Sequence, residues 1–576
     1  MSRPVVRRIE DNEEALAVFE QSLETDKRDL LLNFPTVYVH SNILTNQYEV
    51  YIGETNNIIQ RTRQHLDEVK TDGSWQSRLI GGSNSYLYVI GHEHFNKSLT
   101  LDIENRLMTY LTAVPSITTI HNKRGNEQNK YYPEQELNLI FDQVWRELRK
   151  HDPKLFPKKR EIEDSAIFKA SPFHKLTAQQ MEAKDNIIDM VKRAVKEDFR
   201  GRLIFIEGEA GTGKTVLNSN IFYEMSQLYG DSSEYGDDAE PLKCYLLVNH
   251  DQQLVVYQQI AKKLGIGTHN EVVGKPTSFI NSHTEDDPVD VVFVDEGHLL
   301  WTQGKQSYRG KNQLDDLRKR AKVVVLMFDS QQMLHTQEYW TEEQVDRLRQ
   351  QAKDNAYYYE LKDQLRIRGN EQTKNWILSF VKEGRVLDIP EDDKYEIKIF
   401  DSPAALHQAI LGKASKEDSS LSRLIATFDW DYTDKKKRAD GSDWMVTIGD
   451  WELPWNLQLP GIKGEKGLAW AEQSQTINEV GSTFTIQGFD LNYAGVILGE
   501  SIAYRNGHVV VLPEKCKDHK AVQNRTLENG DKRSFGEQFV KNALNVLMTR
   551  GVDGLYIYAV DDELRNALIT HQRKQR

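Results

Sequence analysis

The sequence predicts a multidomain α/β protein whose larger part contains parallel β-sheets. Its 576 residues exceed what a single hydrophobic core supports. After about residue 200, short and nearly continuous apolar runs alternate with helix-like stretches, a pattern typical of buried parallel strands with helices on both faces. The first of these runs leads directly into a glycine-rich loop, GEAGTGKT, at 208–215. We therefore expect several domains, one of which binds a phosphate-containing ligand.

The N-terminal part has a different pattern. An acidic segment at 1–34 predicts one or two amphipathic helices, and short strand-like and helix-like runs follow it. The expected strands are TVYVH (36–40), YEVYIG (48–53) and SYLYVIG (85–91), and the expected helices are IIQRTRQHLDEVK (58–70) and TLDIENRLMTYLTAV (100–114). A Pro- and Lys-rich segment at 151–165 is typical of a linker.

The apolar runs of the larger part predict two sets of strands. The first set is RLIFIEG (202–208), CYLLVNH (244–250), DVVFVDEG (290–297) and KVVVLMFDS (322–330); the second is SRLIATF (422–428), TFTIQG (483–488), YAGVILGE (493–500), HVVVLP (508–513) and GLYIYAVDD (554–562). The predicted boundaries are a helical extension at 1–34, a small domain at 35–145, a linker at 146–172, and lobes at 173–360 and 361–576, with an insertion at about 429–479.

Composition excludes several classes of protein. A chain with 39% hydrophobic and 28% charged residues is typical of soluble globular proteins, and no apolar run is long enough to span a membrane. The N-terminus turns acidic where a signal peptide needs an apolar core. Only Cys244 and Cys516 occur, so we expect neither a disulfide framework nor a cysteine-rich zinc site. These observations favour the cytoplasm and no membrane partner.

The net charge of −13 does not by itself exclude a nucleic-acid partner, because positive charge can be confined to a groove. Basic runs lie at 158–160, 318–322 and 435–438. Each run is better explained as a solvated face than as a phosphate site.

The glycine-rich loop has the residues that a triphosphate requires. Backbone N–H groups between Gly208 and Gly213, with Gly211 between them, can wrap a polyphosphate at the N-terminus of the following helix. Lys214 would reach the β- and γ-phosphates, and Thr215 would hold Mg²⁺. The expected cofactors are therefore ATP and Mg²⁺ or Mn²⁺.

Two later strands end in polar side chains that suit nucleotide hydrolysis. Asp295 would order the metal ion, and Glu296 would orient the attacking water. The next strand ends in Asp329 and is followed by Gln332, which is a candidate sensor of the γ-phosphate. Strand-end caps have similar sequences, so the sensor role is the less specific of these assignments.

Taken in order, these segments resemble the motif series of superfamily 1 helicases. LTAQQMEA resembles the adenine-reading motif with Gln180 as its glutamine, LKDQLRIRGN carries Arg366, TIQGFD lies at 485–490, and LMTRGVDGLYIYAVD carries Arg550. The match spans about 175–565 and is most similar to Schlafen-type DNA/RNA helicase domains of bacterial proteins. The resemblance implies two RecA-like lobes with ATP in the cleft between them and nucleic acid, with DNA favoured over RNA, across both. Arginines from the far lobe would stabilise charge on the transferring phosphoryl group.

The insertion is rich in aromatic residues. Trp430, Tyr432, Trp444, Trp451, Trp455 and Trp470 could stack on unpaired bases or could form the core of the insertion. The core role is the better explanation for most of them.

The N-terminal segment at about 35–135 resembles the GIY-YIG nuclease family. Tyr38 and Tyr51 stand for the tyrosines of its two opening strands, Arg61 and His65 match the arginine and histidine one helical turn apart, and Glu104 matches the metal-binding glutamate. Asn122 is a weaker candidate for the late asparagine of the family, and the opening triplet here is Val-Tyr-Val instead of Gly-Ile-Tyr.

The residue types suit phosphodiester cleavage. A phenolate or an imidazole would deprotonate the attacking water, while Arg61 and one divalent metal held by Glu104 would stabilise the developing charge. Each of these residues taken alone has an ordinary structural explanation; the order and spacing of the set favour the nuclease.

Our interpretation is a GIY-YIG-like nuclease joined to a helicase-like ATPase. Such a fusion suggests cleavage of foreign or aberrant DNA in a prokaryote, as in antiviral defence against phage, with an oligomer or a defence-system protein as a further expected partner. One alternative keeps the ATPase as a switch that gates the nuclease without processive movement. Another makes the N-terminal domain a nucleic-acid-binding module that does not cut.

Overall fold

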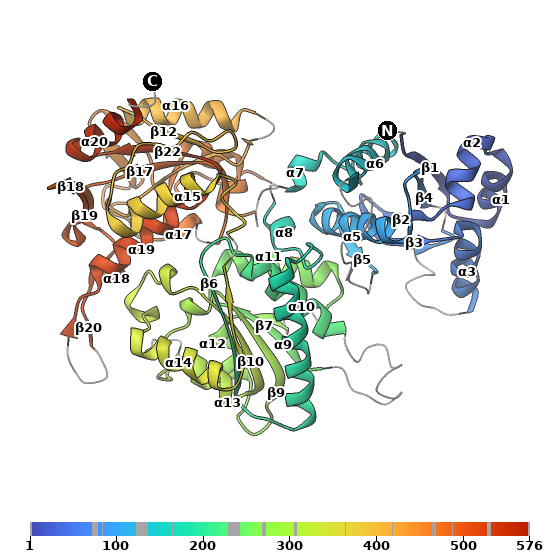
Figure 1. Ribbon diagram of the computed structural model, residues 1–576, viewed down its shortest axis with the longest axis horizontal. Helices are drawn as coiled ribbons and strands as arrows, with labels where there is room; N and C mark the ends of the chain where they lie inside the picture. The colour runs from blue at the N-terminus through green and yellow to red at the C-terminus, as the bar shows by residue number, and fades with distance from the viewer. Residues whose placement is uncertain are drawn as a thin grey trace. The chain divides into compact units, whose positions relative to one another are not determined.

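The computed structural model describes residues 3–71, 79–82, 84–122, 136–163, 165–227, 242–267, 272–304, 308–362, 364–416, 419–463, 465, 468–486, 488–526 and 532–573 (Figure 1). The chain divides into two compact units. The first contains Met1–Met190, Thr215–Leu246 and Leu254–Gly274, and the second contains Val191–Lys214, Leu247–Gln253 and Lys275–Arg576. The predicted domain boundaries come from sequence patterns and differ from this division, and they stay predictions.

A five-stranded sheet forms the N-terminal part of the first unit. Its order is β1-β4-β2-β3-β5, with β1 Val5–Glu10, β4 Ser85–Gly91, β2 Thr36–Leu44, β3 Gln47–Thr55 and β5 Ile117–Ile120. Neighbouring strands are antiparallel except β3 and β5, which are parallel. The helices around it are α1 Glu13–Ser22, α2 Thr25–Arg28, η1 Asp29–Asn33, α3 Ile58–Thr71 and α5 Lys97–Ala113.

The first strand corrects the prediction of a purely helical segment at 1–34. Val5–Glu10 pairs along its whole length with β4, although only Val6 of this strand is buried. Arg7 and Arg8 interrupt the apolar pattern, so the sequence lacks the alternation that indicates a strand. Pairing in the sheet therefore decides the structure of this segment.

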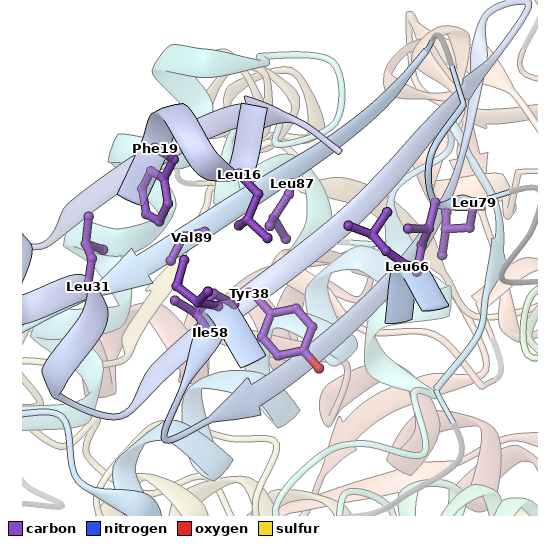
Figure 2. Close-up of a cluster of buried hydrophobic side chains, with 11 residues drawn as sticks. Leu16, Phe19, Leu31, Tyr38, Ile58, Leu66, Leu79, Leu87 and Val89 are labelled. Atoms are coloured by element: carbon purple, nitrogen blue, oxygen red, sulfur yellow. The ribbon is translucent and has the colours of Figure 1, made fainter. Parts of the chain in front are cut away.

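Each face of this sheet is covered by different helices (Figure 1). On one face, side chains of α1, η1 and α3 pack on β2 and β4, as Figure 2 shows; this cluster contains Leu16, Phe19, Leu31, Tyr38, Ile58, Leu66, Leu87 and Val89. Tyr38 lies at its edge with the hydroxyl directed away from the aliphatic side chains. Helix α5 covers the opposite face, where Thr100 Oγ1 donates to Glu54 at the end of β3.

The segment predicted to be a linker is folded against this sheet. It contains α7 Lys159–Glu163 and α8 Ala166–Lys169, and it follows α6 Leu137–His151. Phe156 is fully buried with its ring 5.3 Å from that of Tyr88, and Trp145 Nε1 donates to Pro157 O at 2.8 Å. The prolines and lysines that suggested a linker therefore lie beside apolar side chains that anchor it.

The first unit also contains most of α10 Lys214–Gln227 and α11 Asp251–Lys263, and these helices contact the end of the N-terminal domain. Tyr223 Oη on α10 donates to Asn122 O at 2.9 Å. Lys263 Nζ on α11 donates to Thr112 O and Val114 O, both at 2.8 Å, which satisfies carbonyl groups at the C-terminus of α5. Burial lowers the pKa of Lys263 to about 8.

A six-stranded sheet contains the first predicted set of strands. Its order is β11-β6-β10-β9-β7-β8, with β11 Tyr358–Leu361, β6 Arg202–Gly208, β10 Ala321–Phe328, β9 Val289–Asp295, β7 Cys244–Val248 and β8 Val273–Gly274. The pairs among β11, β6, β10 and β9 are parallel, as predicted. Its helices are α9 Ala178–Lys196, α10, α11, α12 Pro276–Ser282, α13 Gln313–Lys319 and α14 Glu342–Asp354.

A second parallel sheet lies in the C-terminal part. Its order is β12-β22-β17-β13-β16, with β12 Glu396–Ile399, β22 Gly551–Ala559, β17 Leu491–Leu498, β13 Arg423–Ala426 and β16 Val480–Gly481, and every pair is parallel. Figure 1 shows α16 Pro403–Ala414 and α20 Asp562–Arg573 on one side of it and α15 Glu371–Leu378, α17 Thr483–Ile486 and α19 Gly536–Met548 on the other. The prediction of a multidomain α/β fold with parallel sheets is confirmed.

Two predictions for this sheet are wrong, because one predicted strand is a helix and another is a strand that pairs elsewhere. TFTIQG begins with the helix α17, where Thr485 Oγ1 accepts from the N–H of Ser482. HVVVLP contains β19 His508–Val511, which pairs with β18 Ile502–Arg505 in an antiparallel hairpin outside the parallel sheet. Both runs are apolar enough for a strand of the parallel sheet. Their composition alone does not show that one forms a helix and that the other pairs with β18.

The insertion contributes a hairpin, β14 Met445–Ile448 and β15 Trp451–Pro454, to the core of the C-terminal part. Trp455 and Trp470 are fully buried. Trp430, Tyr432, Trp444 and Trp451 are half-buried and pack against the cluster around Trp455. The core role expected for most of these aromatic residues is confirmed. No helix among the described residues is both long and apolar enough to cross a membrane.

Candidate functional site

The glycine-rich loop joins β6 to α10, and its lysine is held by the loop itself. Lys214 Nζ donates to Gly208 O at 2.7 Å and to Glu209 O at 2.9 Å, and it lies 3.4 Å from Asp329 Oδ2. Gly213 has a φ of +78° immediately before this lysine, and Thr215 lies in the first turn of the helix. The ammonium group is thus held by backbone carbonyls of the glycine-rich loop, between the predicted strand and the predicted helix.

Gly211 cannot be replaced by a larger residue here. Its φ is +87°, and a Cβ would lie 2.2 Å from Gln364 Oε1 and 2.7 Å from Arg366 Cβ. The segment after β11 makes this approach because Gln364 Nε2 donates to Ala210 O at 2.6 Å and Leu365 N donates to Gly211 O at 2.8 Å. Sequence reasoning identified Arg366 in this segment but not Gln364, which directly contacts the loop.

Asp295 is the last residue of β9, and Glu296 follows it in a left-handed conformation with a φ of +50°. A non-glycine residue in this region carries strain that surrounding contacts must offset. His298 Nε2 and Gln253 Nε2 each lie 3.4 Å from the Glu296 carboxylate. Burial alone would raise the pKa of Glu296, but the charges of His298, Lys214 and Arg550 outweigh it and hold the pKa below its ordinary value. The carboxylate is therefore ionised at neutral pH.

A chain of polar contacts leads from the loop to the C-terminal sheet. Gln332 Nε2 donates to Asp329 Oδ2 at 2.7 Å, and its Oε1 accepts from Arg550 Nη2 at 3.0 Å. Because Asp329 also pairs with Lys214, four side chains from three predicted motifs are joined in sequence. Burial opposes the charge of Asp329, yet Lys214, His298 and Gln332 keep its pKa below the ordinary value.

The two predicted arginines lie in this region and are held differently. Arg550 is 1% exposed, and burial and the nearby Arg366 lower its pKa. Arg366 Nε lies 2.5 Å from Asp490 Oδ1 at the end of the TIQGFD segment. The structure therefore brings Lys214, Glu296, Asp329, Gln332 and Arg550 together, with Arg366 beside Arg550.

Gln180 lies in the first unit, whereas the rest of this set, apart from Thr215, belongs to the second. Its Oε1 accepts from Thr177 N at 2.9 Å and its own N–H donates to Thr177 Oγ1 at 3.3 Å. This reciprocal pair is a capping box at the start of α9. The adenine-reading role of Gln180 stays a prediction.

A cleft of about 1000 Å³ opens beside the loop. Its walls are formed by loop residues, by the segment after β10, by β11 and by the helices α14, α15 and the C-terminal end of α19; they include Glu209, Thr212, Gln331, Lys353, Tyr358, Lys374, Asn545 and Thr549. A nucleotide is within the size range of ligands that such clefts hold.

In the N-terminal domain, the structure brings four predicted residues together on one face of the sheet. Tyr38 Oη lies 3.3 Å from His65 Nε2, and Arg61 Nε donates to Tyr38 Oη at 3.4 Å. The ring of Tyr51 is 5.5 Å from His65 and 6.2 Å from Tyr38. Arg61 and His65 project from the same side of α3, as their spacing predicts.

Sequence reasoning missed two members of this cluster, His40 and Asp11. In the register of β2 and β3, His40 lies directly opposite Tyr51, so both point to the face that carries Tyr38. The ring of His40 is 5.3 Å from Tyr38 and 5.4 Å from His65. The period of two along TVYVH, with Tyr38 and His40 on one face, was the available signal. We name these six residues the tyrosine–histidine cluster: Asp11, Tyr38, His40, Tyr51, Arg61 and His65.

Burial shifts the ionisation of this cluster toward neutral groups. Burial, with a smaller effect of Tyr51, raises the pKa of Tyr38. Burial, His40 and Arg61 lower the pKa of His65 to about 3. At neutral pH Tyr38 is therefore a phenol and His65 a neutral imidazole.

The YIG triplet is explained by two contacts. A Cβ on Gly53 would lie 2.5 Å from the ring of Tyr38, so only glycine allows this ring to pack across β3. Asn122 holds the residue between, because its Oδ1 accepts from Ile52 N at 2.9 Å and its Nδ2 donates to Ile52 O at 2.6 Å. Asn122 thus extends the pairing of β5 beside the strand that carries Tyr51.

Glu104 is half-buried on α5, which covers the face opposite the tyrosine–histidine cluster. Thr100, one helical turn earlier, contacts Glu54 at the end of β3. A metal held by Glu104 would therefore have to lie around this end of the strand. The described residues contain no group of three or more His, Cys, Asp or Glu side chains that could hold a metal ion. The metal roles of Glu104, Thr215 and Asp295 stay predictions.

Comparisons with known proteins concern mainly the larger part of the chain. Residues 201–561 match the family described as Schlafen group 3, DNA/RNA helicase domain. An uncharacterized protein of Saccharomyces cerevisiae, YPL245W, is 33% identical over 433 residues, which cover 69% of this chain and 91% of the yeast protein.

Solved structures of helicases show weaker similarity. A Pif1 helicase structure described as unwinding forked double-stranded DNA covers 70% of this chain and 97% of its own, at 10% identity and a TM-score of 0.28. Pif1 helicase from Candida albicans covers 69% and 97% at 11% identity and a TM-score of 0.26. A DEAD box protein from Methanococcus jannaschii covers 70% and 95% at 13% identity and a TM-score of 0.24. These TM-scores lie below the range in which two chains share a fold.

Proposed function

Because the chain belongs to the Schlafen group 3 DNA/RNA helicase domain family through residues 201–561, we propose that it uses ATP to move on or to unwind nucleic acid. The observation that carries this proposal is the contact series Lys214–Asp329–Gln332–Arg550. It connects the phosphate-binding loop with the segment that carries the sixth helicase-like motif. We therefore expect a change in the contacts of Lys214 to alter the contacts of the buried Arg550.

The residues suggest how hydrolysis would proceed. Lys214 would exchange its loop carbonyls for phosphate oxygens, since its ammonium group is already held at the loop. Glu296, ionised and backed by His298, would orient the attacking water. Arg550 would stabilise charge on the transferring phosphoryl group. A magnesium ion would neutralise phosphate charge, and the hard oxygen donors of Thr215 and Asp295 fit that ion.

Replacement of Glu296 by glutamine tests the motor. The amide keeps the shape but cannot hold the water as a carboxylate does, so ATP should still bind while turnover falls by about 10²-fold or more. Glu360→Gln, which neutralises an exposed carboxylate in the wall of the same cleft, is the matched control. ATP binding and nucleic-acid-stimulated phosphate release are measured on the same preparations. Wild-type turnover by Glu296→Gln would contradict the assignment.

For the N-terminal domain we propose metal-dependent cleavage of a phosphodiester, with DNA favoured over RNA. This proposal is supported by the convergence of Tyr38, Tyr51, Arg61 and His65 on one face of the sheet. The phenol of Tyr51 is half-exposed, so it can meet a substrate that the buried Tyr38 cannot reach. Arg61 would stabilise charge on the phosphate. A divalent ion held by Glu104 would supply further charge stabilisation.

Purified protein and labelled single- and double-stranded DNA and RNA, with Mg²⁺ or Mn²⁺ and with or without ATP, test both activities. Cleavage that requires the metal and is lost in Tyr51→Phe supports the nuclease. Binding of nucleic acid without cleavage under every condition would favour the non-cutting module. Strand displacement that requires ATP separates a processive motor from a switch.

A gated nuclease without processive movement is a second candidate function. It is favoured by the bond from Tyr223 on α10, the helix that follows the phosphate-binding loop, to Asn122, which holds β3 beside Tyr51. In that case ATP analogues that cannot be hydrolysed should change the cleavage rate. An oligomer, a partner protein and a role in antiviral defence are predictions from the combination of domains alone.

A further inference from the structure

A buried carboxylate–imidazole pair lies behind the tyrosines of the N-terminal domain. Asp11 Oδ2 and His40 Nδ1 are 2.5 Å apart, and neither side chain is exposed to solvent. Asp11 is fixed by the backbone, because its N–H donates to Ser85 O and its carbonyl accepts from Gly81 N, each at 3.0 Å. The carboxylate therefore has a defined position, and it holds the imidazole in one orientation.

The other ring nitrogen of His40 faces a different environment. With the Nδ1 proton donated to Asp11, Nε2 carries a lone pair. This atom is buried and has no hydrogen-bond partner among the residues that the structure describes. The rings around it are those of Tyr38, His65 and Tyr51, with centroids 5.3, 5.4 and 6.2 Å from that of His40.

A purely structural role explains this arrangement poorly. Burying a polar atom without a hydrogen bond costs on the order of 1–3 kcal/mol, and a second buried ionisable group, Asp11, adds to that cost. The chain contains a histidine–carboxylate pair without these features, His121 and Glu49. Their side chains are 12% and 13% exposed, and His121 Nε2 lies 3.3 Å from Glu49 Oε2. The Asp11–His40 pair differs because it is fully enclosed and sits directly across the strand pair from Tyr51.

We propose that Asp11 and His40 form a proton-accepting pair that acts through Tyr51 in phosphodiester cleavage. This role rests on the proposed nuclease function. His40 is enclosed and does not touch the substrate, so it is a positioning residue for the half-exposed phenol, which does.

As the oxygen of water forms its bond to phosphorus, a water proton passes to Tyr51 Oη and the phenol proton passes to His40 Nε2. Because Nε2 has no partner among the described residues, this transfer requires that Tyr51 Oη moves into hydrogen-bond distance of Nε2 when the substrate binds. The bond from phosphorus to the leaving oxygen breaks, and that oxygen takes a proton from solvent. His40 becomes an imidazolium next to the Asp11 carboxylate and later returns its proton to solvent, so the pair is regenerated.

Replacement of His40 by asparagine separates the two functions of the ring. The asparagine amide can still donate to Asp11, in the place of Nδ1–H, but it has no base in the place of Nε2. We expect kcat for cleavage to fall by about 10²-fold, within the usual range for general base catalysis, while KM and ATP turnover stay near wild type. His121→Asn is the matched control and should leave kcat unchanged. Full cleavage activity of His40→Asn would overturn the proposal.

The protonation of the ring provides a readout that does not depend on activity. In the full-length wild type, ¹⁵N chemical shifts of the histidine rings at neutral pH should show a protonated Nδ1 and an unprotonated Nε2 for His40, assigned by through-bond correlation of the ring with the His40 backbone. A protonated Nε2 would overturn the proposal even if His40→Asn failed to fold. Asp11→Asn should weaken this preference and lower kcat.

Cleavage by the wild type and by His40→Asn distinguishes the nuclease function from the role of His40. If the wild type cuts no nucleic acid with Mg²⁺ or Mn²⁺, the proposed nuclease function is wrong and the role of His40 is wrong with it. If the wild type cuts and His40→Asn cuts equally well, the nuclease stands and only the role of the pair is wrong.

Discussion

The phosphate-loop site and the tyrosine–histidine cluster differ in the charge of their central side chains. In the first, charged side chains compensate one another directly, as Lys214 does with Asp329. In the second, aromatic rings lie 5.3 to 6.2 Å apart around Tyr38, and burial keeps Tyr38 and His65 neutral. In the first site the charged side chains are therefore paired with one another, whereas the central rings of the second site carry no charge at neutral pH.

This difference has a consequence for mutations. Removing one member of a compensated network leaves its partner buried and unpaired, so binding, turnover and local stability change together. Removing one of the neutral rings of the tyrosine–histidine cluster should change the rate of the proposed cleavage with less effect on the surroundings.

Lys214→Ala should abolish ATP turnover, with a loss of at least about 10³-fold, because the β- and γ-phosphates lose their ammonium partner. Asp329, 2% exposed, also loses its cation. Phosphate release is measured beside Lys374→Ala, which removes a cation of the same cleft that is paired with Glu371. Normal turnover by Lys214→Ala would remove the basis for the motor assignment.

Arg550→Ala should keep most nucleotide affinity and lose turnover by about 10³-fold, since an arginine supplied to the phosphoryl group acts mainly on the transition state. Arg366, which pairs with Asp490 beside it, is the comparison. If Arg366→Ala loses turnover while Arg550→Ala does not, the assignment of the sixth motif is wrong. ATP affinity and turnover are measured separately for both variants.

Glu104→Ala should remove nucleic-acid cleavage by about 10² to 10³-fold and leave ATP turnover near wild type, because loss of the metal costs several kcal/mol of charge stabilisation. Cleavage and ATP turnover are assayed in the same preparations. Glu54, which contacts Thr100 on α5, provides a nearby carboxylate for comparison as Glu54→Gln. Unchanged cleavage by Glu104→Ala would mean that this glutamate holds no catalytic metal.

Asn122→Ala should lower the stability of the N-terminal sheet by about 2 kcal/mol, because the N–H and C=O of Ile52 lose their partners. Amide hydrogen exchange at Ile52 measures this locally. Asn46→Ala, at an exposed turn between β2 and β3, is the control. Unchanged protection of the Ile52 amide would show that the asparagine clamp contributes little.

The sequence predicted the phosphate-loop site more completely than the other. Its residues stand directly after apolar strands, at Gly208, Asp295 and Asp329, and parallel strands place such positions at one edge. The loop-binding Gln364 was missed because it follows a short strand of four residues, Tyr358–Leu361. Contacts made by a side chain with a distant backbone leave no periodic signal.

The tyrosine–histidine cluster was only partly predictable. Motif spacing located Tyr38, Tyr51, Arg61 and His65, but Asp11 comes from the turn after β1, a strand that the sequence pattern did not indicate. The helix α17 and the hairpin of β18 and β19 were mispredicted for a similar reason, because an apolar run does not show whether it pairs in a sheet or with which strand. Long-range pairing, which local composition does not encode, accounts for these errors.

The bond from Tyr223 to Asn122 has a further meaning for how this chain can be divided. Together with Lys263, which donates to Thr112 and Val114, it makes residues of the ATPase part complete the hydrogen bonding of the N-terminal domain. A fragment that ended at residue 145 would leave the last carbonyls of α5 and the carbonyl of Asn122 without these donors. Replacing either part by an unrelated domain should therefore destabilise the other part. We expect the gene segments that encode the two parts to be inherited together.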